Sequence, residues 1–573
     1  MQDLDTAQAE IRHLETQLER LERGALDPEL FKKLRLQYGV YSMRRAPSAY
    51  MVRVRVRLGI LQAGQLEALA DVCERLTPGR ACHLTTRQDV QLYGVERAVL
   101  PTLLRCLAAA GLTTREASGN VVRNITCCPW AGVAPEEAFD VTPYAQAVGE
   151  YLLRNPLTQL LPRKIKIAFE GCPVDHARTP IHDLGIVGIL HEGRPAFRIS
   201  IGGGLGPQPR AAQLLEPVTP VDWLLPTVDA VLRVFERAGE RRNRARARLK
   251  FLVETLGWEE FQRRVLAERP AVWATQSGHA LRLGQAATGE LAVTRAFHAM
   301  DVEHPDALAR WCATNVAAQK QPGFASILVR VPYGDLSAAQ LRGLAAIART
   351  FAGGARLTNT QNVLLRFVPR AAVPSVYEAL EPLRLAEPWA ERMADVTRCP
   401  GAESCLSAIT RPRGLAEAME ALCHNGLSSM ADASLSLKFS GCPNACGQHH
   451  IADIGGFGVS LRVGERYVPC YQLLVGGGTS SGNARFGQRL ARVPAQWTPE
   501  AVRRLVVFYR DARQPEETFG AFVARVGIPT LQETLGNLPE VNLQAVQRDP
   551  QLCTDLGAEE PFVPDAGKGE CAA

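Results

Sequence analysis

The sequence lacks the features that mark a membrane, secreted or nucleotide-binding protein. No apolar run approaches the roughly 18 to 20 residues of a membrane span. The segment 1–26 has the spacing of a charged amphipathic helix and no signal-peptide core. No G-x-G-x-x-G follows a strand pattern, because GGGLGP at 202–207 lacks the third glycine. A net charge of +6 against 65 basic residues gives no indication of nucleic-acid binding. We therefore expect a cytoplasmic protein that uses no membrane, no nucleic acid and no nicotinamide or flavin of its own.

Cysteine, in contrast, is plentiful. Fifteen cysteines in 573 residues, an odd number without a secretory signal, favour reduced thiols, some of them in metal or catalytic use. An apolar content of 46% and a charged content of 22% fit a globular protein. The length predicts two to four domains.

The chain contains two copies of one pattern. Residues 54–95 and 329–368 each have the pattern of a strand, an amphipathic helix and a second strand. Residues 169–188 and 439–458 share, without a gap, a Phe, a Gly-Cys-Pro, an Ile, an Asp and two further glycines. Glycine triplets follow in both copies. The sequence therefore predicts an internal duplication.

The differences between the copies carry the chemistry. His176 in the first copy stands where Cys446 stands in the second, so only the second has a Cys-x-x-x-Cys. The first copy instead carries cations that the second lacks, namely Arg87, Arg163, Lys164 and Lys166. Pairing of the halves about a pseudo-two-fold axis would bring a soft-metal site and an anion-binding site face to face.

Four cysteines of the second copy form the candidate metal site: Cys399, Cys405, Cys442 and Cys446. The five-residue gap between the first two suits zinc knuckles poorly. Four thiolates in a reducing compartment also suit a [4Fe–4S] cluster. The alternative is that these are buried thiols acting as small apolar groups. We expect the first-copy cysteines Cys127, Cys128 and Cys172 not to be ligands.

The pattern CPGAESC…GCPNACG, with TTRQ/TNTQ, PRKIK and GGGLG in the same order, resembles the sirohaem- and [4Fe–4S]-dependent sulfite and nitrite reductase family over about residues 30–530. The resemblance implies an internally duplicated α+β fold of three domains around the two cofactors. It implies that the four cysteines bind the cluster and that Cys446 is also the axial ligand of sirohaem. It places substrate contacts on Arg53, Arg123, Lys164 and Lys166, and sirohaem contacts on Thr85, Arg87, Gln91 and Arg163.

Cations are needed at such a site because sirohaem is a polycarboxylate and its substrate is an anion. An unpaired buried anion costs several kcal/mol. Arginines can grip oxyanions in a bidentate manner, while lysines can supply protons. Some relatives carry a covalent Tyr–Cys link beside sirohaem. Val121 stands where that cysteine aligns, so we expect no link to Tyr50. The run 240–250, ERRNRARARLK, fits either a solvated helix face or contacts to carboxylates.

The repeats divide the chain into six predicted segments. They are an N-terminal helix (1–30), a ferredoxin-like half-domain (31–97), a sirohaem-binding α+β domain (98–300), a second half-domain (301–372), an α+β domain with the cysteines (373–535), and a partly extended or disordered tail (536–573).

The predicted function is the six-electron reduction of sulfite to sulfide, with nitrite reduction to ammonia at the same site as the alternative. Electrons would come from a separate protein, ferredoxin or a flavoprotein subunit. A related iron–sulfur enzyme of cobalamin biosynthesis is disfavoured because the four basic substrate residues are present. A zinc-stabilised nucleic-acid-binding protein is the hypothesis from another class.

Overall fold

The computed structural model describes residues 2–44, 46–275, 290, 297, 303–431, 433–480, 482–538, 541–564, 567 and 569–570. The chain begins with helices α1 (Gln2–Glu22) and α2 (Pro28–Gln37). Asp27 starts α2, because its carboxylate accepts the N–H groups of Glu29 and Leu30. The predicted boundary between segments at 300–301 lies outside the described residues, and the six ranges stay a prediction.

The two ferredoxin-like halves each form a five-stranded sheet and exchange a strand. The first has the order β1 (Val40–Met43), β2 (Ala46–Val54), β5 (Val90–Glu96), β4 (Ala81–Leu84) and β13 (Asp335–Ser337). The second has the order β11 (Val316–Ala318), β12 (Phe324–Val329), β15 (Val363–Pro369), β14 (Gly354–Leu357) and β3 (Ile60–Leu61). Each sheet thus ends on a strand from the other copy, so the halves form one domain.

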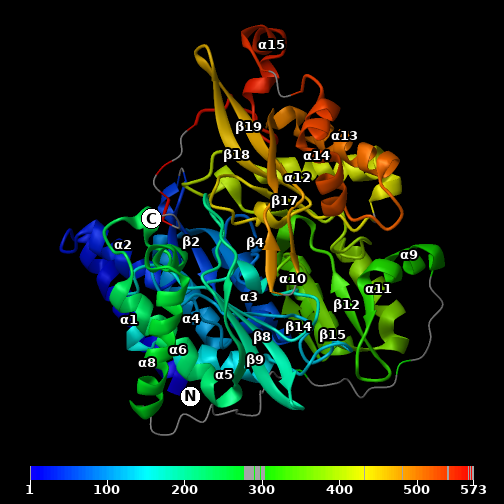
Figure 1. The fold of residues 1–573 in the computed structure, drawn as a ribbon. Coiled ribbons are helices and arrows are strands. Elements are labelled where there is room, and N and C mark those ends of the chain that lie inside the picture. Colours follow the sequence, from blue (N-terminus) through cyan, green and yellow to red (C-terminus); the bar gives the residue numbers. More distant parts are fainter. Residues whose placement is uncertain are drawn as a thin grey trace.

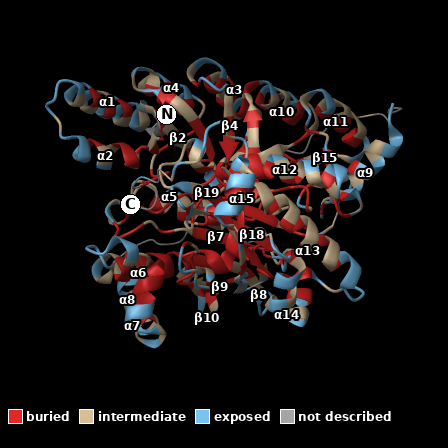
Figure 2. Cartoon of the chain, turned by 90° about the horizontal axis from the view of Figure 1, so that it is seen from above, coloured by how far each residue is buried: buried red, intermediate tan, exposed pale blue. Residues whose placement is uncertain are grey.

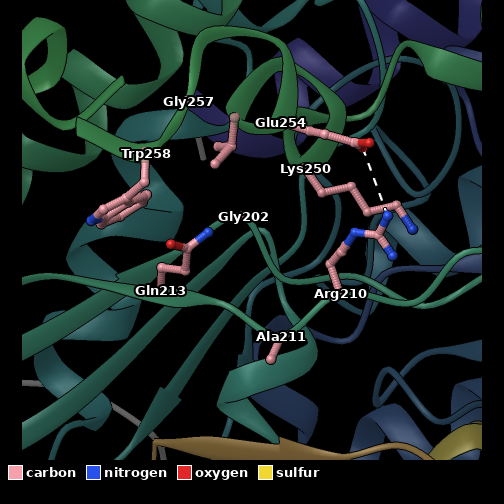
Figure 3. A pocket seen from close by; sticks show the side chains of 9 residues that line it. Gly202, Arg210, Ala211, Gln213, Lys250, Glu254, Gly257 and Trp258 are labelled. Atoms are coloured by element: carbon pink, nitrogen blue, oxygen red, sulfur yellow. Dashed lines mark ion pairs between the residues drawn. The ribbon is translucent and has the colours of Figure 1, made fainter. Parts of the chain in front are cut away.

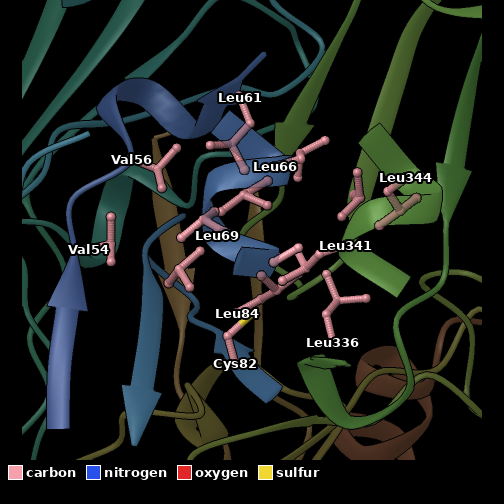
Figure 4. Packing of buried hydrophobic residues seen from close by; sticks show 14 of the residues in the cluster. Val54, Val56, Leu61, Leu66, Leu69, Cys82, Leu84, Leu336, Leu341 and Leu344 are labelled. Carbon is pink, nitrogen blue, oxygen red and sulfur yellow. The ribbon is translucent and has the colours of Figure 1, made fainter. Parts of the chain in front are cut away.

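Two equivalent helices form the core between these halves. In α3 (Ala63–Leu76) the leucines Leu66 and Leu69 are fully buried, and in α10 (Ala338–Phe351) Leu341 and Leu344 hold the corresponding positions. Figure 4 shows the leucines of the two helices pointing toward one another. Their helical spacing in both copies is what the sequence pattern predicts. Around them lie α4 (Leu100–Ala109), α9 (Pro305–Asn315) and α11 (Val373–Leu380).

Each copy also contains a larger module with its own five-stranded sheet. The first copy has the order β10 (Gln213–Pro220), β9 (Arg194–Ile201), β8 (Leu184–His191), β7 (Ile167–Glu170) and β6 (Thr126–Cys127). The second has β16 (Thr397–Arg398), β17 (Leu437–Ser440), β18 (Ile454–Val463), β19 (Arg466–Val475) and β22 (Gln488–Pro494). In both, two parallel pairs are followed by a long antiparallel hairpin. The α+β fold and its internal duplication are therefore confirmed (Figure 1).

Helices cover the outer faces of these modules. They are α5 (Thr142–Leu152), α6 (Val221–Ala238), α7 (Leu249–Leu256) and α8 (Trp258–Thr275) in the first copy, and α12 (Pro412–Asn425), α13 (Thr498–Ala512) and α14 (Phe519–Leu535) in the second. A short hairpin, β20 (Gly478–Ser480) and β21 (Asn483–Arg485), precedes β22. Figure 2 shows the buried residues gathered on the central strands. Among the described helices, none combines the length and apolarity needed to cross a membrane.

The described part of the C-terminal tail contains a short helix and contacts the rest of the chain. Helix α15 (Leu543–Arg548) packs Val546 on the β18–β19 hairpin. Asp555 Oδ2 accepts the N–H of Arg411 at 2.7 Å. Glu570 Oε2 accepts the N–H of Ser42 at 2.9 Å, and its carboxylate pairs with Arg35. The described part of the tail is therefore held by scattered polar contacts rather than by periodic apolar positions, and the expectation of a partly extended or disordered tail stays a prediction.

Candidate cofactor and substrate site

The two copies meet through a pair of matching loops. In the loop 85–88 of the first copy, Thr86 Oγ1 donates to the carbonyl of Cys446 at 2.9 Å. In the loop 358–361 of the second copy, Asn359 Nδ2 donates to the carbonyl of His176 at 3.1 Å. His176 and Cys446 are equivalent positions of the repeat, so each loop makes the same contact with the other copy. This is the pseudo-two-fold pairing that the sequence differences predict.

Gln88 and Gln361 anchor these loops, and their role was not recognised in the sequence. Gln88 Nε2 donates to the carbonyls of Cys127 (2.9 Å) and Leu357 (2.8 Å). Gln361 Nε2 donates to Leu84 O at 2.6 Å, and its Oε1 accepts the N–H of Arg398 at 2.8 Å. Each buried glutamine therefore ties a strand of one copy to a strand of the other. Glutamine stands at this position in both copies of the repeat, and this recurrence is the feature of the sequence that indicates a shared structural role.

The four cysteines of the second copy gather beside the loop 85–88. Cys399 follows β16, Cys405 follows a short 3-10 turn, and Cys442 and Cys446 follow β17. Burial, and then the neighbouring Cys446, raise the pKa of the Cys399 thiol to about 12. Burial, then Cys446 and then Cys399, raise the pKa of Cys442. Thiols that oppose one another's ionisation in this way suit a cation that stabilises their thiolates.

Glycine is required where the cysteine loops touch. A Cβ on Gly441 would lie 2.6 Å from the carbonyl oxygen of Thr410 and 3.0 Å from Cβ of Ala408. The N–H of Gly441 donates to Cys399 Sγ at 3.2 Å. Ala445, next to Cys446, has a positive φ of 58°. The loop is therefore shaped by close backbone approach, which explains why its sequence does not fit an ordinary helix.

Arg53 and Arg123 converge on the same acceptors. Arg53 Nη1 lies 3.3 Å from the hydroxyl of Tyr41, and Arg123 Nη1 lies 3.4 Å from it. Both also donate to the carbonyl of Ala117, at 3.5 Å and 3.0 Å. On the neighbouring strand, the amide of Gln91 reaches Arg53 Nη2 at 2.6 Å and the hydroxyl of Tyr93 at 2.7 Å in the orientation that satisfies both. Gln91 thus holds Arg53 in place.

Lys164 and Lys166 flank Ile165, which forms a parallel β-bridge with Val122. The N–H of Arg123 donates to the carbonyl of Ile165 at 2.9 Å, so the two lysines extend on one side of that residue. Both are half-buried. Burial, and then the charges of Arg87 and Arg248, lower the pKa of Lys166 to about 7. Lys166 can therefore exchange a proton near neutral pH in the cofactor-free chain.

Arg87 has guanidinium donors to spare. Its Nη2 donates to the carbonyl of Asn124 at 2.7 Å, while its buried Nε and Nη1 have no hydrogen-bond partner in the part of the chain that the structure describes. Burial, with Arg123 and Arg53 nearby, lowers its pKa to about 9. Thr85 Oγ1 accepts the N–H of Arg87 (3.2 Å) and of Asp89 (3.1 Å), so Thr85 shapes this loop. Arg87 is suited to a carboxylate ligand.

The other predicted residues lie around this group. Arg163 is buried, with Nη1 3.4 Å from Asn120 Oδ1. Val121 and Tyr50 are buried, and valine offers no thiol for a covalent link.

The basic run 240–250 is not a helix face. Residues 240–248 lie between α6 and α7, with a 3-10 turn at Arg244–Arg246, and the last two residues of the run begin α7. Arg248 Nη2 pairs with buried Asp183 at 2.8 Å, and Asp183 also accepts the N–H of Lys166 at 2.9 Å. Lys250 Nζ donates to the carbonyl of Leu205 at 3.0 Å. Beside it, a hollow of about 220 Å³ carries the ion pair of Arg210 and Glu254 (Figure 3).

Comparison with known proteins identifies the class of this chain. The family described as "Nitrite and sulphite reductase 4Fe-4S domain" matches residues 118–272 and 389–541. The family "Nitrite/Sulfite reductase ferredoxin-like half domain" matches residues 43–110 and 317–383. The chain therefore belongs to the nitrite and sulphite reductase family and is an oxidoreductase. Its cofactors are the [4Fe–4S] cluster that the family description names and the sirohaem that the sequence resemblance implied.

Individual relatives agree with this assignment. The chain is 31% identical to a ferredoxin–nitrite reductase of Synechococcus elongatus, over 84% of this chain and 90% of that protein. It is 28% identical to "Sulfite reductase [ferredoxin] 1" of Mycolicibacterium paratuberculosis, over 83% and 82% of the two chains. The solved structure of the Mycobacterium tuberculosis NirA protein has the same fold, with a TM-score of 0.76, 24% identity and coverage of 91% and 97%.

Proposed function

We propose that this chain reduces nitrite to ammonia, with sulfite reduction to sulfide as the second candidate. The observation that carries the proposal is the contact of Thr86 with Cys446, which sets the arginine loop of the first copy against the thiolate loop of the second. The resemblance seen in the sequence alone favours sulfite. The nitrite reductases of Synechococcus elongatus and Haloferax mediterranei, at 31% and 28% identity, support nitrite, and the mycobacterial sulfite reductase at 28% supports the second candidate.

The thiolate side of the site would hold the metals. Cys399, Cys405, Cys442 and Cys446 would bind the [4Fe–4S] cluster, and Cys446, the exposed member, would also bind the sirohaem iron. The cofactor pair, when bound, supplies electrons one at a time to the anion.

The cationic side would hold the cofactor and the anion. Arg87, with its unpartnered donors, and Arg163 are placed to bind sirohaem carboxylates. Arg53 and Arg123, which share Tyr41 and Ala117 as acceptors, would grip the anion. Thr85 and Gln91, expected to contact sirohaem, would also position Arg87 and Arg53, a role that their hydrogen bonds to these arginines support.

Protons would come from the lysines. An arginine stays protonated through the reaction, whereas Lys166, with a pKa lowered to about 7, can give and regain a proton. Lys164, two positions away on the same side of the strand, would assist. The reduction consumes protons as it breaks nitrogen–oxygen or sulfur–oxygen bonds, so a lysine poised near neutrality is useful here.

Ferredoxin is the proposed electron donor, because the relatives named above are ferredoxin-dependent. The test is steady-state turnover of the sirohaem-loaded enzyme with reduced ferredoxin. We expect a higher kcat/KM for nitrite than for sulfite. A higher kcat/KM for sulfite would favour sulfite reduction instead. If the fully loaded enzyme turned over neither anion, both candidate functions would be refuted.

A further inference from the structure

The first copy holds a group of metal-ligand side chains that the established activity does not use. Cys128 follows β6, Glu170 ends β7, and Cys172 and His176 lie in the turn after β7. One ligand atom from each of the four lies within 4.8 Å of all the others. The two cysteines and the glutamate are buried, and His176 is half-buried.

The distances fit one tetrahedral ion. Cys128 Sγ lies 3.8 Å from Cys172 Sγ and 3.5 Å from His176 Nδ1. Zinc–sulfur bonds of about 2.3 Å and zinc–nitrogen bonds of about 2.0 Å give tetrahedral edges of about 3.8 Å and about 3.5 Å. A disulfide would need a sulfur–sulfur distance of about 2.05 Å. The two distances therefore match those expected between two sulfur ligands and an imidazole nitrogen that share one ion.

The group occupies the position of the proposed cluster site in the repeat. The N–H of Cys128 donates to Phe169 O at 2.9 Å, as the N–H of Cys399 donates to Phe439 O at 3.3 Å. The ungapped repeat then superimposes Cys172 on Cys442 and His176 on Cys446, whereas Ala134 falls on Cys405. The first copy thus has ligand-type residues at three of the four cysteine positions.

The two sites differ in the spacing of their ligand atoms. Among the described residues, the second-copy cysteines form no group of three or more ligand atoms within 4.8 Å. Cluster thiolates each sit on a separate iron, so they stand further apart than ligands that share one ion. The closer spacing in the first copy fits a single ion.

We propose that the first copy binds one divalent cation of borderline softness, Zn²⁺ being the best fit, through Cys128, Cys172 and His176. Two thiolates and an imidazole are ligands that zinc prefers. Glu170 completes the set. Its Oε1 accepts the N–H groups of Gly171 (2.8 Å) and Cys172 (2.9 Å), and its Oε2 accepts that of Ala177 (2.9 Å). Oε2 lies 4.0 Å from His176 Nδ1, so the carboxylate stands beside the fourth position.

The ion would stabilise the junction between the copies. It would tie β6 to the turn after β7, and the carbonyl of His176 in that turn accepts the hydrogen bond of Asn359 from the second copy. The role is structural, since the group lies in the copy without the Cys-x-x-x-Cys. This proposal differs from the sequence expectation that Cys128 and Cys172 are not ligands, and the zinc measurement below decides between them.

The test measures zinc in the enzyme loaded with its iron cofactors. After chelation and dialysis against Zn²⁺, we expect about one zinc per chain by elemental analysis. Zinc-edge X-ray absorption, which sirohaem does not obscure, should give zinc–sulfur distances of about 2.3 Å. Cys172→Ser should weaken zinc binding by more than about 100-fold, beyond the effect of a lost outer partner. Its sirohaem and cluster content should stay unchanged.

Two further variants keep the test decisive. His176→Gln, at the half-buried position, should also lose zinc, and it replaces Cys172→Ser if that protein does not fold. Cys127→Ser is the matched control, because Cys127 is a buried neighbour outside the group. The proposal is overturned if wild-type enzyme takes up no zinc, if the absorption spectrum shows no sulfur ligand, or if Cys127→Ser loses as much zinc as His176→Gln.

Discussion

Replacing Lys166 with methionine should make the cofactor-free chain more stable and the loaded enzyme less active. The fold lowers the pKa of Lys166 from 10.5 to about 7. At about 1.36 kcal/mol per pKa unit, this is a penalty of up to roughly 5 kcal/mol on the ammonium group at neutral pH, an upper bound because water and side chains relax around it. Methionine keeps most of the stem and removes the penalised charge.

The sign of the pH effect follows from proton binding. Between pH 7 and 10.5 the unfolded chain holds the lysine proton more often than the folded chain does, so stability rises with pH across this window. The free energy of unfolding of the wild-type apoprotein should therefore increase relative to that of Lys166→Met as pH rises from 7 to 9. Urea unfolding at the two pH values measures the difference. Lys33→Met, at an exposed lysine of α2, is the control for the loss of any lysine.

The loaded enzyme should show the functional cost. Sirohaem content should survive in Lys166→Met, because Arg87 and Arg163 remain to hold carboxylates. Turnover should fall by about 100-fold or more, the usual scale for losing a positioned proton donor or an anion-stabilising charge. Absorption spectra give the cofactor content, and donor-coupled assays give the turnover. Near-normal turnover, or a loss explained entirely by missing sirohaem, would refute the proton-donor role.

Three other predictions test the rest of the site. Cys446→Ser should lose both sirohaem and cluster, whereas Cys172→Ser should retain both. Equal iron loss in the two variants would contradict the assignment of the cluster to the second copy. Gly441→Ala should lower cluster content, because the new Cβ would lie 2.6 Å from the carbonyl of Thr410, and unchanged iron and spectra would argue against that. The isolated chain should not turn over with NADPH alone but should accept electrons from reduced viologen or ferredoxin; NADPH-driven product formation would contradict this, because no nucleotide motif is apparent in the sequence.

The sequence predicted the repeat, the fold class and the pairing of the copies, because these depend on periodic patterns and on residues that recur at fixed offsets. It did not predict the exchanged strands β3 and β13. Strands of two and three residues are too short to carry an alternating pattern. It also did not predict that the strand register places Gln91 opposite Arg53; the expected contact of Gln91 with sirohaem stays a prediction. Register depends on bulges and turns that the sequence does not specify at single-residue resolution.

The cluster of ligand-type side chains in the first copy is not apparent from the sequence for a related reason. The first copy lacks the Cys-x-x-x-Cys, so the sequence predicts no ligands there, whereas a ligand set depends on how atoms lie in space. Cys128 and His176 are 48 residues apart in sequence and 3.5 Å apart at their ligand atoms. Parallel pairing of β6 with β7 produces that closeness. The same pairing of β16 with β17 brings Cys399 beside the loop of Cys442. A duplicated fold thus builds two ligand cradles, and substitutions such as that at His176 decide what each can bind.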